Sequence, residues 1–311
     1  MAPSDAAALD AWHAARARVV GASEVAALFG CSPHTSHWSL WQIKAGRVAA
    51  PDLSGDQRVT WGLRLESVIA DAVAEERGWT ILPGGHRTSS RVEGWGCTLD
   101  REIGDRGGGV LEVKNVDWLV RKREWGDEPP PHILLQLQSQ LGVTGREWGA
   151  VAALVGGNEL RIWEYQARPK VIAEIARRVR AFWQSIRENR PPPVDGSAST
   201  SDTLAAMYPQ ASAPMLDLRS DNMLPEACAA LLRAKEDKAA AEREIARCDA
   251  IIREKAGPAE AVMVNGFTVR LPAVAGTPDK TITPDMVGQT IKGRAGYRRL
   301  SVKRFGEGEA A

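Results

Sequence analysis

The chain has 311 residues, of which 44% are apolar and 25% are charged, and its formal net charge is +1; this composition is typical of a soluble globular protein with one large domain or two smaller ones. The lack of a long apolar run, of a signal-peptide core and of paired cysteines excludes membrane-spanning and disulfide-stapled secreted proteins, so we expect a cytoplasmic protein. The balanced charge leaves nucleic-acid binding open, because basic residues can gather in one groove.

The distribution of tryptophan marks a domain boundary. All 11 tryptophans lie at or before Trp183, and the stretch RENRPPPVDGSASTSD follows at 187–202. Prolines stop a helix, and small polar residues after them are typical of a linker. We therefore predict a first domain at 1–190, a linker at 191–224 and a C-terminal extension at 225–311.

Helical and strand patterns alternate within the first domain. Apolar residues three and four apart predict amphipathic helices, and short apolar runs bounded by glycine predict strands. In chain order, the patterns predict helices at 23–30 and 61–79, strands at 94–103 and 110–116, a helix at 131–145, two strands at 148–165 and a helix at 170–189. This order predicts an α/β (α+β) fold with a mixed central sheet flanked by helices on both sides.

The C-terminal extension is expected to contain a long helix and a small β unit. Between Pro225 and Lys255, apolar residues recur at alternating spacings of three and four, interrupted only by Lys238, and this narrow seam needs a partner helix. Asn265-Gly266 predicts a hairpin, and a short helix is expected after Thr283. The basic stretch at 291–304 fits either contacts with DNA phosphates or a charged edge strand.

Glu112 and Lys114 lie two residues apart in the predicted strand at 110–116, so both project from one face. The E-x-K pattern alone carries little weight, because it also occurs at 236–238 on a charged helix. The difference is Asp100, at the end of the preceding strand, which the glycine-rich turn GDRGGG brings back beside Glu112. Two carboxylates suit Mg²⁺, and a lysine beside them can orient a water or offset negative charge. The alternative is an ordinary ion pair on an exposed strand.

Four motifs carry a resemblance to a known family. LDREIGDRGGGVLEVK (99–114) resembles the PD-(D/E)XK nuclease signature, with Leu99 where proline is usual. AWHAARARVVGASEVAALFG (11–30), WGLRLESVIADAV (61–73) and ILLQLQSQLGVTG (133–145) resemble the other motifs of the phage lambda-type exonucleases, or YqaJ-like viral recombinases, in the same order. The resemblance implies a PD-(D/E)XK restriction-endonuclease-like core.

The resemblance also implies a role for each matched residue. The residues that would hold a metal are Asp100, Glu112, the backbone carbonyl of Val113, and Glu66 directly or through water. Lys114 would be the catalytic lysine and Gln136 would support the site, while Arg16 and Ser23 would receive the 5′-terminal phosphate of DNA. Taken singly, each of these side chains also fits an ordinary helix or surface position.

The function that the resemblance implies is a Mg²⁺-dependent 5′-to-3′ exonuclease, with Mn²⁺ as a possible substitute. It would act on ends of linear double-stranded DNA and leave 3′ overhangs for phage-type homologous recombination. A homotrimer and a single-strand annealing protein are the partners implied by the family. Two alternatives stay open: a RecB-like or repair endonuclease with the same metal site, and a non-catalytic DNA-binding recombination mediator. The oligomeric state and the role of residues 195–311 are not fixed by the sequence.

Overall fold

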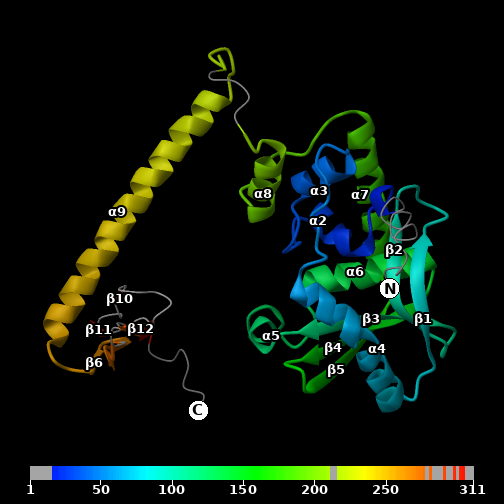
Figure 1. Cartoon of the computed structure of the whole chain (residues 1–311), viewed down its shortest axis with the longest axis horizontal. Helices are drawn as coiled ribbons and strands as arrows, with labels where there is room; N and C mark the ends of the chain where they lie inside the picture. Colours follow the sequence, from blue (N-terminus) through cyan, green and yellow to red (C-terminus); the bar gives the residue numbers. More distant parts are fainter. Residues whose placement is uncertain are drawn as a thin grey trace. The chain divides into compact units, whose positions relative to one another are not determined.

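The computed structural model describes residues 16–210 and 216–276, and the backbone of four short strand segments at 280–281, 290–291, 297–298 and 301–304. The chain divides into two compact units, Met1–Ser212 and Ala213–Ala311, which are described separately (Figure 1). None of the helices in these described parts combines the length and the apolar character that a membrane span requires.

The first unit is built on one five-stranded mixed sheet. Its strands are β1 (Ile81–Thr88), β2 (Gly96–Ile103), β3 (Gly109–Val116), β4 (Trp148–Val155) and β5 (Glu159–Gln166), and they lie side by side in that order. Only β3 and β4 run parallel, and every other neighbouring pair is antiparallel. The predicted mixed sheet is therefore confirmed.

Helices surround this sheet. They are the 3₁₀ helix η1 (Ala22–Glu24), α2 (Val25–Leu28), α3 (His37–Lys44), α4 (Gln57–Arg77), α5 (Trp118–Glu124), α6 (Pro131–Thr144), α7 (Pro169–Arg187) and α8 (Ala198–Met207). The chain passes from β3 through α5 and α6 before it enters β4, which is the crossover that a parallel strand pair requires.

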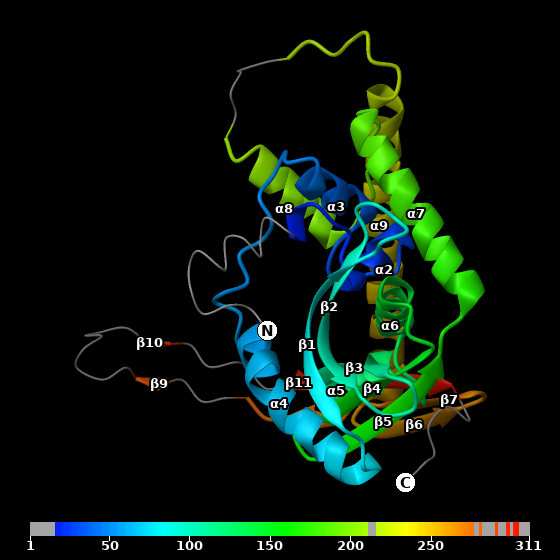
Figure 2. The ribbon, with the colours of Figure 1, turned by 90° about the vertical axis from the view of Figure 1, so that its right-hand side faces the viewer.

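Side-chain alternation along β3 separates two faces of the sheet. Leu111 and Val113 are buried with Ile69 and Val73 of α4, whereas Val110 and Val116 are buried with residues of α6. The two helices thus cover opposite faces (Figure 2). Glu112 and Lys114 fall on the α6 face, because they alternate with Leu111 and Val113.

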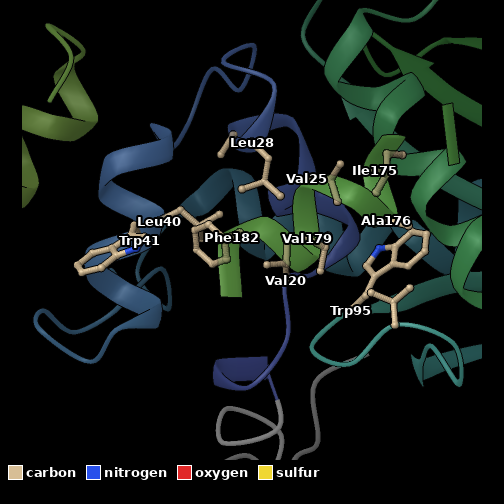
Figure 3. Packing of buried hydrophobic residues seen from close by; sticks show 12 residues of the cluster. Val20, Val25, Leu28, Leu40, Trp41, Trp95, Ile175, Ala176, Val179 and Phe182 are labelled. Carbon is tan, nitrogen blue, oxygen red and sulfur yellow. The ribbon is translucent and has the colours of Figure 1, made fainter. Parts of the chain in front are cut away.

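A further core joins the N-terminal helices to α7. Figure 3 shows Val20, Leu40 and Trp41 packed with Val179 and Phe182 of α7. The ring of Trp41 is fully buried, and its Nε1 donates to Ser185 Oγ at 3.0 Å. This packing fixes the segment that contains Arg16 and Ser23 against the body of the first unit.

Four elements differ from the sequence expectation: β1, α3, α5 and α8 occupy segments for which no element was predicted. Strand β1 contains Pro83 and Gly84, residues that disfavour strands, but it is an edge strand, where such residues are tolerated. Gly84 lies so close to β2 that an added Cβ would be 2.1 Å from the Leu99 carbonyl oxygen. Any larger residue would therefore displace the strand that carries Asp100.

Helix α8 changes the domain boundary. It lies inside the predicted linker at 191–224, yet it packs on α3 and belongs to the first unit, which ends at Ser212 rather than at residue 190. Buried hydroxyls form the contact: Ser36 Oγ lies 2.8 Å from Thr200 Oγ1, and Thr203 Oγ1 donates to Ser39 Oγ at 2.9 Å. A serine- and threonine-rich sequence is typical of a linker, but here the same residues bond a neighbouring helix.

The second unit begins with α9 (Leu224–Ala256), the predicted long helix. The predicted hairpin is also present, as β6 (Ala261–Val264) and β7 (Phe267–Arg270) around Asn265 and Gly266, whose φ is +80°. The remaining strands are short: β8 (Ala273–Val274), β9 (Lys280–Thr281), β10 (Thr290–Ile291), β11 (Tyr297–Arg298) and β12 (Ser301–Arg304). The helix predicted after Thr283 and the side chains of the basic stretch at 291–304 lie outside the described residues.

The position of α8 generates a test of the domain boundary. A chain that ends at Arg190 lacks α8, so Ser36 and Ser39 lose their hydroxyl partners and the Ser36 N–H loses its bond to Ser199 Oγ, 3.2 Å away. At about 1 kcal/mol for each of these three hydrogen bonds, the unfolding free energy should fall by about 3 kcal/mol. For a unit of this size, the melting temperature should fall by roughly 6–12 °C. A chain that ends at Ser212 is the control and should keep the melting transition of the first unit. Equal melting temperatures for the two truncated chains in scanning calorimetry would contradict the boundary at Ser212.

Candidate active site

The centre of the site is the carboxylate of Glu112. It is almost fully buried, with 1% of the side chain exposed, while 27% of Lys114 reaches solvent. Lys114 Nζ lies 2.6 Å from Glu112 Oε1. The alternative of an ordinary ion pair on an exposed strand is thus excluded, because the Glu112 side chain is buried beneath α6.

Two glutamines of α6 complete the surroundings of Glu112. Gln136 Nε2 donates to Glu112 Oε1 at 2.5 Å, and Gln140 Nε2 donates to the other oxygen, Oε2. Gln136 also accepts from Lys114, with Nζ 3.3 Å from its Oε1. Both carboxylate oxygens therefore have hydrogen-bond donors, as a polar group that water cannot reach requires.

Gln140 was not predicted, although the sequence contains a signal for it. Residues four apart on a helix share a face, and Gln140 follows Gln136 at that spacing. Gln138 lies between them and points elsewhere: it donates to the carbonyl of Gln166 and accepts from the N–H of Arg168. Its amide links α6 to the start of α7.

Asp100 stands where β2 and β3 separate. The pairing of these strands ends at Arg101 and Leu111, and beyond it Asp100 Oδ2 accepts from the Val113 N–H at 2.8 Å. Burial, and then the charge of Glu112, raise the pKa of Asp100 to about 8, although the Lys114 ammonium and the Val113 N–H act in the opposite direction. The two carboxylates thus repel each other in a buried place, as predicted from the glycine-rich turn that joins their strands.

Lys114 keeps its proton in this setting. Burial alone would lower the pKa of its ammonium, but the charges of Glu112 and Asp100 and the hydrogen bond to Glu112 outweigh burial and raise it. A cationic side chain therefore stands beside the two acids.

Glu66 joins the group from α4. Its carboxylate forms an ion pair with Arg101 of β2, and its negative charge contributes to the raised pKa of Asp100. Asp100 of β2 thus interacts with one acid from each of two other elements, Glu66 of α4 and Glu112 of β3. Arg101 was not predicted as a site residue. It follows Asp100 in β2 and forms the ion pair with Glu66.

Arg16 and Ser23 lie in the N-terminal segment rather than around β3. Ser23 is exposed on η1, which packs against α6 and β2. Lys44 fixes this segment: its Nζ donates to the Arg16 carbonyl at 2.9 Å and lies 2.8 Å from Glu24 Oε2. Burial first, and then the charge of Arg16, lower the pKa of His86 in β1, which places the Arg16 guanidinium near that strand.

A cavity of about 470 Å³ contains none of the predicted site residues but borders the same strand as Asp100. Its lining includes Arg87, Arg146 and Glu102. Glu102 joins the two arginines, with Arg87 Nη2 at 2.8 Å and Arg146 Nη2 at 3.0 Å. The cavity therefore presents partly compensated positive charge two residues along β2 from Asp100.

The donor chemistry fits a hard divalent cation. Among the described residues, no three His, Cys, Asp or Glu side chains form a ready-made metal cluster. Mg²⁺ needs less, because it usually takes one or two carboxylates and completes its shell with waters and phosphate oxygens. Asp100 and Glu112 supply two carboxylates whose mutual repulsion a cation would relieve, and Val113 supplies a carbonyl on the adjoining backbone.

Comparison with known proteins agrees with the order of the motifs. Residues 11–147 match the model of the YqaJ-like viral recombinase domain. No curated protein matches the chain.

Solved structures resemble the chain weakly. The alkaline exonuclease LHK-Exo from Laribacter hongkongensis, also solved in complex with dAMP, has 22% identity and a TM-score of 0.49, over 58% of this chain and 94% of that chain. A structure of SSO0001 has 18% identity and a TM-score of 0.32, over 44% of this chain and 64% of that one. The match over residues 11–147 therefore identifies this part of the chain as a YqaJ-like viral recombinase domain.

Proposed function

We propose that the protein is a Mg²⁺-dependent exonuclease that degrades linear double-stranded DNA from its 5′ ends and leaves 3′ overhangs for recombination. The observation that carries the proposal is the convergence of Asp100 and Glu112 beside the ammonium of Lys114. The membership of residues 11–147 in the viral recombinase family supports DNA as the substrate. Mn²⁺ has the same preference for oxygen ligands and is expected to substitute.

Each residue has a separate task in phosphodiester hydrolysis. Asp100, Glu112 and the Val113 carbonyl would hold the cation, which when bound supplies polarisation of the scissile phosphate and an acidified water. Lys114 is held by Glu112 and Gln136 where its ammonium can orient that water or offset charge on the phosphate. Gln136 and Gln140 fix the orientation of the Glu112 carboxylate through their hydrogen bonds to its two oxygens.

The N-terminal segment would recognise the 5′ end of the DNA. In this proposal Arg16 and Ser23 bind the 5′-terminal phosphate, with the guanidinium and the hydroxyl as donors. The bond from Lys44 to the Arg16 carbonyl and the Glu24 ion pair hold that backbone in place. The arginines of the cavity beside β2 would contact phosphates further along the duplex.

The first test compares linear and closed circular duplex DNA with Mg²⁺. Linear DNA should be digested from its ends and the closed circle should persist, and Lys114→Ala should reduce the rate on linear DNA by on the order of 10²–10³-fold because a fixed positive charge is lost. Lys238→Ala, in the second E-x-K sequence on exposed α9, is the matched control and should digest at the wild-type rate. Rapid cutting of the closed circle, or an unimpaired Lys114→Ala protein, would rule the proposal out.

The second test concerns the 5′-phosphate. Wild-type protein should prefer 5′-phosphorylated ends over 5′-hydroxyl ends, and Arg16→Ala should reduce this preference by about 10–100-fold, the equivalent of one charge-assisted hydrogen bond. Ser23→Ala should act in the same direction with a smaller effect. Arg18→Ala, in the same segment, should leave the preference unchanged. A preference that survives in Arg16→Ala would show that the phosphate binds elsewhere.

The third test addresses Gln140. Gln140→Leu removes the donor to Glu112 Oε2 at a fully buried position, so the carboxylate should lose its fixed orientation. Turnover should fall by about 10–100-fold, as for other residues that orient a metal ligand. Gln138→Leu is the matched control on the same helix and should lower the melting temperature while the rate stays near wild type. Equal rates for Gln140→Leu and wild type would show that Glu112 needs no second amide.

A further inference from the structure

Helix α9 has a heptad seam that the described residues of its own unit leave largely uncovered. Only Ala256 is buried among its 33 residues, and Leu231 and Ile245 are 56% and 68% exposed. Helices of this kind gain most of their stability from packing of an apolar face. Ile252 already contacts the small β unit of the same chain, so the seam is covered only at its C-terminal end.

The seam has two columns of different size. One column contains large side chains and the other contains small ones. The large column is Leu231, Lys238, Ile245 and Ile252, and the small column is Ala227, Ala234, Ala241 and Cys248. The columns alternate with a strict seven-residue repeat, which is the pattern of a left-handed coiled coil.

We propose that α9 pairs with α9 of a second copy of this chain as an antiparallel two-stranded coiled coil. In an antiparallel pair, each residue of one column faces a residue of the other column in the second helix. A single register satisfies all positions, and its layers are Ala227 with Ile252, Leu231 with Cys248, Ala234 with Ile245, and Lys238 with Ala241. Every layer therefore combines one large and one small side chain, which fills the core evenly.

A parallel pair would lack this complementarity. In register, it would stack each residue on its own equivalent, so that Ala layers would be underfilled and Lys238 would meet a second Lys238. Underfilled layers leave voids that destabilise a core, and two ammonium groups at one layer repel each other.

The charges beside the seam favour the same direction. In the antiparallel register, Lys235 lies beside Glu242 of the second copy, an attractive pair that occurs twice by symmetry. Asp237 would lie beside Glu244 of the second copy, but Glu244 already has Arg247 at 2.6 Å in its own helix. The parallel register places Asp237 beside Glu242 and Glu244 beside Asp249 and contains no attractive pair at these positions. Glu242 and Asp249 also have partners in their own helix, Lys238 at 3.8 Å and Arg253 at 2.8 Å, so the preference comes from the attraction between Lys235 and Glu242.

The pairing has a consequence that rests on the proposed function. Each chain brings one DNA-end site, so a particle joined through α9 carries two, and both ends of a linear duplex can be engaged by one particle. The seam itself contains no site residue, so the pairing and the nuclease activity can be tested separately.

Cysteine cross-linking tests the register. In a Cys31→Ser/Cys228→Ser background that keeps Cys248, the substitution Leu231→Cys should yield a disulfide-linked species of twice 33.7 kDa on oxidation, seen on a non-reducing denaturing gel. Arg243→Cys, on the outward face of the same helix, is the matched control and should give no such species. The background protein alone should also give none, since the two copies of Cys248 are far apart in an antiparallel pair.

The outcomes separate the possibilities. A linked dimer in the background alone would show a parallel pair, and a Leu231→Cys protein that digests DNA but never cross-links would show that another protein or another part of this chain covers the seam. In light scattering of the full-length chain, Ile245→Glu should halve the mass of the particle and leave the rate on linear DNA unchanged. An unchanged mass in that variant would also overturn the pairing, whatever becomes of the nuclease proposal.

Discussion

The site depends on one buried carboxylate with four close neighbours. Glu112 has 1% of its side chain exposed, and a charge in such a place is costly unless every oxygen has a donor. Lys114, Gln136 and Gln140 supply these donors, and Asp100 is a second acid whose ionisation burial and the charge of Glu112 oppose. If both acids are ionised, one lysine does not neutralise them, and the remaining negative charge is one that a divalent cation could balance. This unneutralised negative charge is the feature of the fold on which the proposed hydrolysis depends.

The rest of the first unit serves to bring these groups together. The parallel pairing of β3 and β4 requires a crossover, and α6 in that crossover places Gln136 and Gln140 over Glu112. The separation of β2 from β3 frees the Val113 N–H for Asp100. Because η1 packs against α6 as well, the segment with Arg16 and Ser23 is anchored to the same helix. One helix thus connects the acids proposed to be catalytic to the region proposed to bind the DNA end.

The sequence predicted the elements that follow simple periodicity. The alternation in β3 and the glycine-rich turn predict that Glu112, Lys114 and Asp100 lie together, and the resemblance singles out Glu66 on α4 and Gln136 on α6. The sequence does not predict strand β1, because glycine is rare in strands. Gly84 is required by the close approach of β2, which only the packed sheet shows. The segment of α8 has the composition of a linker. Its hydroxyl groups bond residues more than 160 positions earlier in the chain, and no local sequence pattern indicates those partners. Gln140 could have been found from its four-residue spacing after Gln136, whereas the pairing of Glu66 with Arg101 depends on how α4 lies against the sheet.

The central claim is that Asp100 and Glu112 together bind one divalent cation. Its most direct test is a crystal of the Lys114→Ala protein grown with Mn²⁺ and measured at a wavelength where manganese scatters anomalously. An anomalous peak is expected within coordination distance of both carboxylates and of the Val113 carbonyl oxygen, and no peak is expected when Asp100→Asn is added. A peak elsewhere on the first unit, or one that survives Asp100→Asn unchanged, would show that Asp100 and Glu112 do not bind the cation together.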